Sequence, residues 1–431
     1  MRAWYMLAMV TAAYVLSGID RKVPFILADA IKHDLSLSDT QLGLVTGAMF
    51  AVVYSTIAFP LASLADRRSR KWILGWAVII WSGFTAAGGF AMNFWSLTAS
   101  RMGVAAGEAA CTPAAHSMIG DEFAPRYRSR ALGVYFFGSQ LGILIGLALG
   151  GWINQVANWR VAMFMLGVPG ILLGLLIFLT VKEPRRTAHG ETPSEAEAAG
   201  VKVAGPSVRS VVWTLMKQPT LVHLILGAAM ANIVTAAIQA FFPSHVIRTF
   251  HLGTGEVGLS LGLALGVGGI IGTLLGGIFG DWLRQRAPWK ALAFVSATVL
   301  VTGPCLVLAV NAKSYPVALA MLFIAHTCTM VNPGPGIATL QSLMKSNTHA
   351  VATATYLFVV SGLGLAVGPL VTGMLSDSFS HLGSQRSLQL ALMIMTAFTI
   401  WGAIHYLLSA LSLRRHDQGK SFEAASPASP A

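Results

Sequence analysis

The sequence predicts an all-α membrane protein whose twelve transmembrane helices form two bundles of six. Composition is the first reason, because 55% of the 431 residues are hydrophobic and only 11% are charged, whereas about 25% of the residues of a soluble domain are charged. The second reason is that the apolar residues fall into twelve segments of about 20 to 29 residues, each long enough to cross a hydrocarbon core of roughly 30 Å. The predicted spans are residues 3–31, 39–64, 72–92, 95–119, 130–156, 161–181, 219–247, 256–281, 289–310, 316–343, 350–375 and 387–411.

The distribution of basic residues is the third reason and also predicts an orientation. Of the 29 Lys and Arg residues, 21 fall on the side of the membrane that carries both termini, five fall in loops on the other side and three lie within spans. Because cytoplasmic loops are enriched in Lys and Arg, we expect a multi-pass protein of the inner (plasma) membrane with both termini in the cytoplasm. The net charge of +12 then reflects orientation and does not indicate nucleic acid as a partner.

A polar segment divides the spans into two halves. Residues 182–218 are rich in Ala, Glu, Pro and Gly, which is typical of a flexible linker. Within this linker, residues 208–217 are expected to form a short amphipathic helix on the membrane surface. We therefore expect a six-helix bundle over residues 1–181, a cytoplasmic linker, a second six-helix bundle over 219–413 and a disordered cytoplasmic tail over 414–431.

The two halves carry matching features. Asp66 follows the second span and precedes a run of basic residues, and Asp281 has the same place after the eighth span. Glycines four residues apart recur in the fifth span (Gly142, Gly146 and Gly150) and again in the eleventh. Such spacing lets helix backbones approach closely in lipid. Two equivalent halves of closely packed helices suit a transporter that alternates access between the two sides of a membrane.

Ionisable residues inside two apolar segments are the strongest sign of function. Asp20 and Arg21 lie in the first span, and Arg101 and Glu108 lie in the fourth. A charge in hydrocarbon costs at least about 2.5 kcal/mol, so such residues are rare unless they face a cavity or a partner. At about 1.5 Å per residue, Asp20 and Glu108 lie at similar depth, roughly 16 and 19 Å from the outer ends of their spans, and Arg101 lies about 10 Å farther out. The expected site has an outer Arg101 and a central group formed by the other three residues.

These charges can serve transport or merely hold helices together. In the first interpretation Glu108 and Asp20 carry a coupled proton, because desolvation and a neighbouring cation act on a carboxylate in opposite directions. Arg21 and Arg101 then bind the substrate. In the second interpretation the same residues form a static network of ion pairs between helices.

Other polar residues are weaker candidates. Asn232 and Gln239 share a face of the seventh span and are expected to line the cavity and bind substrate, although hydrogen bonds between helices would explain them equally. The run 332–336 is expected to break the tenth span, which is tolerated where backbone lines a cavity. His116 follows Glu108 by eight residues and fits a core histidine better than a proton relay. The three cysteines are scattered, so neither a disulfide nor a metal site is expected, and no cofactor motif is present.

These features together resemble the major facilitator superfamily and, within it, the Spinster-like transporters. The likeness is carried by residues 18–21 (GIDR) in the first span, 64–71 (LADRRSRK) after the second and 107–109 (GEA) in the fourth. The resemblance implies that the Asp, Arg and Glu of these motifs are needed for transport. It also implies a substrate that is a lysolipid or a sphingoid-like molecule.

The loop after the second span is expected to act in the conformational change. An Asp at the inner end of a helix can face the positive N-terminus of a neighbouring helix, here the eleventh, and so latch the cytoplasmic side. Asp66, Arg67, Arg70 and Lys71 form this predicted latch. The alternative is a basic loop that only fixes the orientation of the chain.

The combined interpretation is a monomeric, proton-coupled secondary transporter of an anionic or zwitterionic amphipathic substrate, with protons and membrane lipids as its other partners. The lipid-like substrate follows from the resemblance alone. The alternative is a symporter or exporter of small organic anions or drugs on the same fold. An enzyme is not expected, because the chain lacks a cluster with the spacing of a nucleophile or of metal ligands.

Overall fold

The computed structural model describes residues 2–67, 69–183, 207–345 and 348–425, and these residues form helices and connecting turns without any strand. The predicted all-α class is therefore confirmed. The first group of helices comprises α1 (Arg2–Leu35), α2 (Asp39–Gly43), the π-helical turn η1 (Leu44–Ala48), α3 (Met49–Arg67), α4 (Arg70–Gly88), α5 (Phe94–Glu108), α6 (Cys111–Glu122), α7 (Pro125–Val156) and α8 (Trp159–Thr180). The second group comprises α10 (Val208–Lys217), α11 (Pro219–Phe250), α12 (Thr254–Arg286), α13 (Pro288–Val310), α14 (Tyr315–Met330), α15 (Pro333–Leu343), α16 (His349–Ser378), the 3-10 turn η3 (Ser380–Leu382) and α17 (Ser384–Ala425).

Ten helical stretches of the described chain are long and apolar enough to cross a membrane. The other two predicted spans correspond to α4 and to the pair α5–α6. Neither α5 nor α6 is long enough alone, because the helix is interrupted at residues 109–110. With these two additions the helices match the twelve predicted spans.

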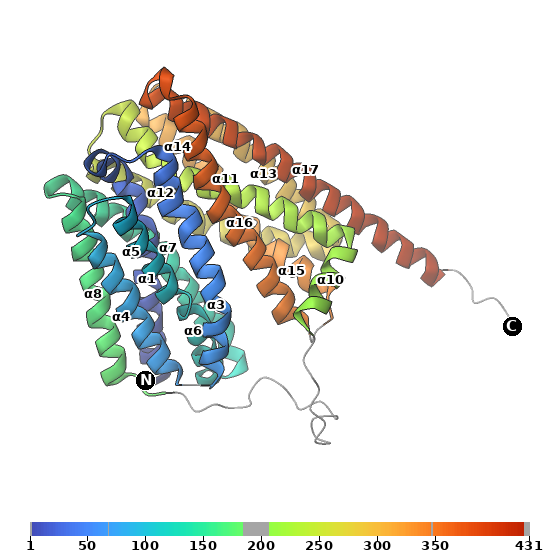
Figure 1. The fold of residues 1–431 in the computed structure, drawn as a ribbon. Coiled ribbons are helices and arrows are strands. Elements are labelled where there is room, and N and C mark those ends of the chain that lie inside the picture. Colours follow the sequence, from blue (N-terminus) through green and yellow to red (C-terminus); the bar gives the residue numbers. More distant parts are fainter. Residues whose placement is uncertain (1, 68, 184–206, 346–347, 426–431) are drawn as a thin grey trace.

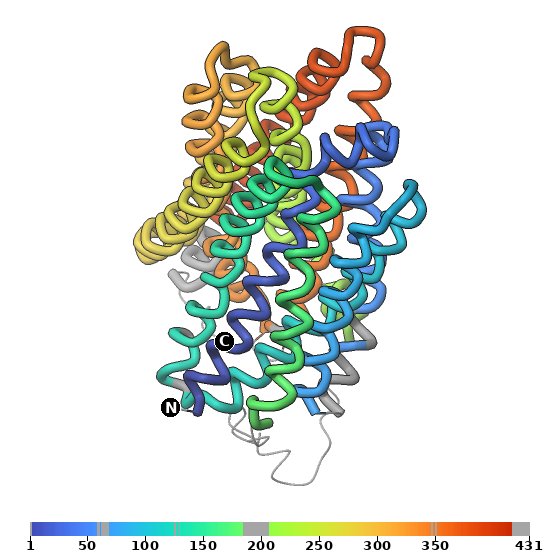
Figure 2. Tube along the Cα trace, turned by 90° about the vertical axis from the view of Figure 1, so that its left-hand side faces the viewer, coloured from blue at the N-terminus to red at the C-terminus, as the bar shows by residue number. Residues whose placement is uncertain are grey.

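The helices pack as two groups that lie side by side (Figures 1 and 2). Within the first group α1 packs against α7 and α4 against α8, and within the second α11 packs against α16 and α17. Between the groups, α7 packs against α12, α1 against α11, and α2 with η1 against α16. We call the end of the bundle that carries Arg2 and Glu183 the linker end, and the opposite end, which carries residues 36–38 and 251–253, the far end. In Figure 1 the groups meet at the far end and diverge toward the linker end, where the N-terminus lies.

Glycines make the close contacts of α7 possible. A Cβ on Gly142 would lie 2.9 Å from the Cα of Gly18 on α1, and one on Gly146 would lie 2.9 Å from the Cα of Ile19. Between the groups, a Cβ on Gly258 of α12 would lie 2.2 Å from the carbonyl oxygen of Leu147. The predicted role of the fifth-span glycines in close helix packing is confirmed.

The linker helix agrees with the prediction, whereas the C-terminal tail differs from it. The short helix expected at residues 208–217 is present as α10, which buries Val211 and Leu215. The rest of the expected linker from 184 to 206 lies outside the described residues. The tail was expected to be disordered from 414 onward, but α17 continues to Ala425. The first proline of the tail is Pro427, and a proline disfavours helix in the residue before it rather than farther upstream.

Candidate functional site

A partly buried ion pair joins α1 to the end of α5. The Nε atom of Arg21 donates to Oε2 of Glu108, whose side chain is fully buried. The second carboxylate oxygen of Glu108 has no hydrogen-bond partner among the described residues. Arg21 and Glu108 thus meet as members of the expected central group, and what they do in transport stays a prediction.

The chain itself places Glu108 at a helix terminus inside the membrane. Pro113 has no N–H to donate to the carbonyl of residue 109, and its ring crowds that carbonyl, so the fourth span breaks at residues 109–110 and α5 ends at Glu108. Gly107 lets α5 approach α4 closely, since a Cβ there would lie 2.8 Å from the backbone nitrogen of Trp81. A helix C-terminus carries partial negative charge, so the Glu108 carboxylate needs the Arg21 guanidinium as its counter-charge.

Asp20 and Arg101 form a second buried contact beside this pair. Nη1 of Arg101 donates to the backbone carbonyl of Asp20 at 3.1 Å, and both residues are buried. The side chains of Thr85 and Trp81 on α4 act on the Asp20 carboxylate as hydrogen-bond partners, although neither contact has the geometry of a full hydrogen bond, and the Nε of Arg101 has no partner among the described residues. Leaving one buried polar group unpaired costs about 1–3 kcal/mol. Such a group of half-satisfied atoms is unusual in a packed core and is typical of a site that binds something.

Aromatic rings of α3 line the arginines. The Cζ of Arg21 lies 4.9 Å from the ring centre of Tyr54 and 5.7 Å from that of Phe50, and the Cζ of Arg101 lies 5.3 Å from the ring centre of Phe50. A guanidinium over an aromatic face is stabilised by about 0.5–2 kcal/mol. These aromatics were not predicted, because one aromatic residue in an apolar helix looks like any other in the sequence.

Lys22 is a further site residue that sequence reasoning missed. Its Nζ donates to Oε1 of Gln239 on α11, which links the two groups of helices, and it lies 4.9 Å from the ring centre of Phe25. No carboxylate of the described residues lies within ion-pair distance of Lys22. The signal was available, since Lys22 is the third consecutive charged residue of an apolar span.

The predicted pair on the seventh span separates in the structure. Gln239 lines a small pocket of the second group, together with Thr235 and His326. The other lining residues come from α11–α14 and are mostly apolar. Asn232 does not line this pocket and lies against α16, where a Cβ on Gly364 would be 1.9 Å from its Oδ1. Helical spacing put both residues on one face but could not tell which part of the face meets a neighbouring helix.

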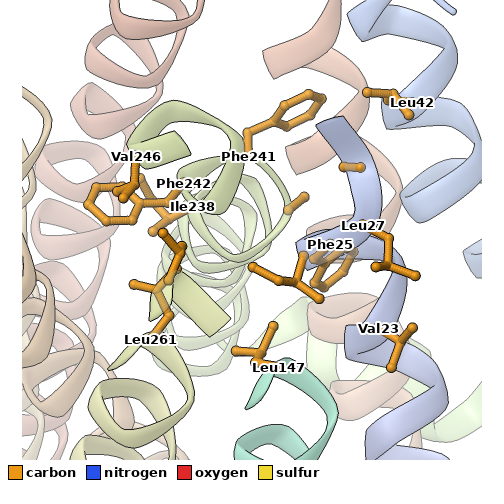
Figure 3. Close-up of a cluster of buried hydrophobic side chains, with 14 of the residues drawn as sticks. Val23, Phe25, Leu27, Leu42, Leu147, Ile238, Phe241, Phe242, Val246 and Leu261 are labelled. Carbon is orange, nitrogen blue, oxygen red and sulfur yellow. The ribbon is translucent and has the colours of Figure 1, made fainter. Parts of the chain in front are cut away.

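Apolar side chains close the contact between the groups on the far-end side of Lys22. They belong to one cluster of buried residues that includes parts of both groups (Figure 3). The residues labelled there are Val23, Phe25 and Leu27 of α1, Leu42 of α2, Leu147 of α7, Ile238, Phe241, Phe242 and Val246 of α11, and Leu261 of α12. The charged site therefore lies at the edge of a sealed interface.

A polar cluster holds the far end closed. Arg248 of α11 is buried, and its Nε donates to Asp29 of α1 at 2.7 Å and its Nη2 to Asp39 of α2 at 3.2 Å. Asp39 also accepts from Lys32 at 2.5 Å, and Asp377 of α16 accepts from the backbone N–H groups of residues 39 and 40. The sequence placed Arg248 in an outer loop, but α11 continues to Phe250. The loop position expected for Arg248 is therefore wrong, and the residue forms ion pairs between the two groups of helices.

The linker end of the first group carries the described part of the predicted latch. Arg70 is buried, pairs with Asp121 of α6, and its Nε lies 3.1 Å from Oε1 of Glu183. Glu183 also accepts from the Ser69 hydroxyl and from the backbone N–H of Lys71. The side chains of Asp66 and Arg67 lie outside the described residues. The latch role of all four predicted residues therefore stays a prediction.

The remaining sequence candidates are placed as follows. The tenth span was predicted to break at residues 332–336, and it breaks at 331–332 between α14 and α15, so that only Asn332 of the predicted run lies at the break, where it accepts from Tyr406. His116 stacks edge-on against Tyr135 and Phe136, which fits a core histidine. Among the described residues there is no group of three His, Cys, Asp or Glu side chains that could hold a metal ion.

Known proteins of one family resemble the chain over nearly its whole length. The profile of the Major Facilitator Superfamily matches residues 10–369. An MFS-type efflux pump of Mycolicibacterium smegmatis is 32% identical, with 96% of this chain and 94% of the pump covered. The hexuronate transporter of Bacillus subtilis is 26% identical, with 85% and 86% covered. The crystal structure of a bacterial homologue of the human lysosomal transporter Spinster, inward-facing and unoccupied, superposes with a TM-score of 0.86 at 26% identity, covering 96% of this chain and 98% of the homologue.

A match over 10–369 ends within α16, so it includes most of both groups of helices, and it contains every charged residue of the site. The Spinster homologue shares the arrangement of both groups as well as part of the sequence. The chain therefore belongs to the Major Facilitator Superfamily, as a Spinster-like membrane transporter and not an enzyme.

Proposed function

We propose that the chain is a proton-coupled secondary transporter of an anionic or zwitterionic amphipathic molecule. The observation that carries the proposal is the Arg21–Glu108 ion pair, fully buried on its Glu108 side, beside the buried Asp20 carboxylate, whose side-chain neighbours Thr85 and Trp81 are neutral. Three cations (Arg21, Lys22 and Arg101) face only two carboxylates, so the site has an excess positive charge. A desolvated site of this kind favours a negatively charged ligand.

Coupling follows from competition for Arg21. While Glu108 is ionised it holds the guanidinium. A proton on Glu108 removes that attraction, which frees Arg21 to bind the acidic group of a substrate. In the reverse direction, a substrate that takes Arg21 leaves a buried carboxylate without its counter-charge, and such a group gains a proton. Binding of a proton to Glu108 and binding of the substrate to Arg21 thus strengthen each other, as symport requires.

Alternating access is supported by where the two groups touch. The Arg248 cluster and the apolar cluster join the groups at the far end, whereas the groups diverge toward the linker end (Figure 1). With the termini in the cytoplasm of a bacterial cell, as the charge bias indicates, this divergence supports an inward-facing state. The similarity to an inward-facing Spinster homologue supports the same assignment.

An amphipathic substrate is favoured by the surroundings of the charges. Phe50 and Tyr54 flank the arginines, and the pocket beside Gln239 is mostly apolar. A lysolipid or sphingoid-like molecule, with a small charged headgroup and an apolar body, fits this combination. The second candidate is a small organic anion or drug, and it is supported by the named hexuronate transporter and efflux pump among the relatives.

Thermal shifts of the purified protein separate these readings. Oleoyl-lysophosphatidylglycerol is compared with neutral monooleoylglycerol, and D-glucuronate with D-glucose. We expect the anion of at least one pair to raise the melting temperature, and its neutral counterpart to leave it unchanged. Arg101→Ala should reduce the affinity by about tenfold or more, since a hydrogen bond to a charged group contributes about 1.5–3 kcal/mol. Arg160→Ala, at an exposed far-end arginine, is the control. Equal shifts from charged and neutral ligands would overturn the proposal.

A further inference from the structure

Lys22 has no part in the proton-coupling pair, yet it lies beside it. We propose that Lys22 binds the acidic group of the substrate directly, and that Gln239 holds its ammonium group until the substrate arrives. The proposal rests on the proposed function and adds to it a binding residue and a substrate charge.

Lys22 lies where the two groups of helices meet. Its Nζ contacts Gln239 of α11 and lies 4.9 Å from the ring of Phe25. Gln239 in turn lines the pocket of the second group, as does His326. A ligand held by Lys22 can therefore contact residues of both groups.

The contacts of Lys22 leave its ammonium group without a carboxylate in direct contact. An ammonium group has three donors, and the acceptor that the described residues offer is a neutral amide oxygen. Arg21 is paired with Glu108, and Arg101 donates to the backbone carbonyl of Asp20. Because Lys22 is only partly buried, an anion that enters the site can reach its ammonium group and supply the missing ion-pair partner.

The charge count indicates which acidic group fits. With both carboxylates ionised the three cations leave one unit of positive charge, and with one carboxylate protonated they leave two. A carboxylate or phosphodiester balances the first state, and a phosphomonoester, which carries about −1.5 to −2 at neutral pH, balances the second. The geometry therefore points to phosphomonoesters as the substrates most strongly favoured when a proton is bound.

Binding would also loosen a link between the groups. The Lys22–Gln239 hydrogen bond crosses from α1 to α11. A ligand whose acidic group binds the Lys22 ammonium replaces this hydrogen bond. The two groups of helices are then connected through the ligand. Substrate occupancy is thereby connected to the movement of one group against the other.

Affinity measurements on four variants test the proposal. Dissociation constants are determined for oleoyl-lysophosphatidic acid, glucose 6-phosphate, D-glucuronate and neutral monooleoylglycerol. Lys22→Met should weaken binding of the anions by about 10- to 100-fold, and Lys22→Arg should largely preserve it. Gln239→Glu should weaken anion binding as well, because the new carboxylate would form an ion pair with the Lys22 ammonium group and compete with the ligand. Lys313→Met, at an exposed lysine of the far end, is the control.

The outcomes distinguish this proposal from the proposed function. If Lys22→Met weakens the binding of anionic ligands only, the role of Lys22 is supported. Whether the affected anion is the lysolipid or a soluble sugar derivative identifies the source of the acidic group. The unliganded melting temperature of each variant shows whether it folds. Wild-type binding of an anion that Lys22→Met leaves unchanged would overturn the inference alone. A wild-type protein that prefers no anion to its neutral counterpart would overturn the proposed function and the inference with it.

Discussion

Replacing Arg248 with methionine should open the far end of the transporter. The guanidinium of Arg248 is the cation that connects α11 to both Asp29 and Asp39 on the first group. Methionine keeps much of the side-chain volume but removes the charge and the donors. The two carboxylates then lie in a closed interface, and that state loses stability relative to one in which water reaches them.

The size of the effect follows from the contacts. Removing one partner of a buried ion pair costs about 3–5 kcal/mol. The loss here is smaller, because Lys32 still neutralises Asp39 at 2.5 Å and the Asp29 side chain is 13% exposed. About 1.5–3 kcal/mol is expected, which corresponds to roughly a 10- to 100-fold shift of the equilibrium toward a state open at the far end.

Electron paramagnetic resonance distances measure this shift directly. Spin labels at Met92→Cys and Lys313→Cys, both exposed at the far end of different groups, should show a longer distance population in the Arg248 variant, in a background without the native cysteines. Arg160→Met is the matched control, since Arg160 pairs with Asp34 at the same end but within one group. An unchanged distance distribution in the Arg248 variant would refute the idea that this cluster holds the far end closed.

Three further predictions concern packing, the linker end and the latch. Gly258→Leu should lower the melting temperature, since even a Cβ there would lie 2.2 Å from a carbonyl oxygen of α7, whereas Gly277→Leu on the same helix has open space and should not. Burial raises the pKa of Glu183, but hydrogen bonds from Ser69 and from residues 70 and 71 outweigh it and lower the pKa below the ordinary 4.5. Its contribution to stability is therefore complete above about pH 4.5 and is lost as the pH falls further, so melting temperatures of Glu183→Gln should depend less on acid pH than those of the wild type. Asp66→Asn should move the population several-fold toward opening at the linker end, because a carboxylate at a helix N-terminus contributes about 0.3–2 kcal/mol, and labels on the linker ends of α6 and α15 that report no change would exclude the latch.

The central charges could be predicted because membrane segments make ionisable residues conspicuous. Arg21 and Glu108 come together as expected, since the rise per residue places them at one depth on antiparallel helices. The break of the tenth span was predicted from its prolines and glycines. The break that ends α5 was missed, although Pro113 was a visible signal. Charged residues in an apolar helix thus indicate that a site is present, but they do not indicate where the helix breaks around it.

Contacts between the two groups could not be predicted in the same way. Lys22 and Gln239 are 217 positions apart, and which residues of α1 and α11 face each other depends on the state of the transporter. Arg248 was assigned to a loop because the apolar segment ends before it, yet its helix continues into a buried ion-pair cluster. Such pairings arise from tertiary packing, and the local pattern of one segment does not contain them.

Proton-driven accumulation by a Glu108→Gln variant tests the central claim most directly. Glutamine keeps the shape of the protonated acid but cannot release a proton, so the competition between Glu108 and substrate for Arg21 disappears. In liposomes that contain the purified protein and an anion identified by thermal shift, the variant should still bind and exchange the anion but should not accumulate it when a pH difference is imposed. Full pH-driven accumulation by the variant would contradict the account and leave Glu108 as a structural partner of Arg21.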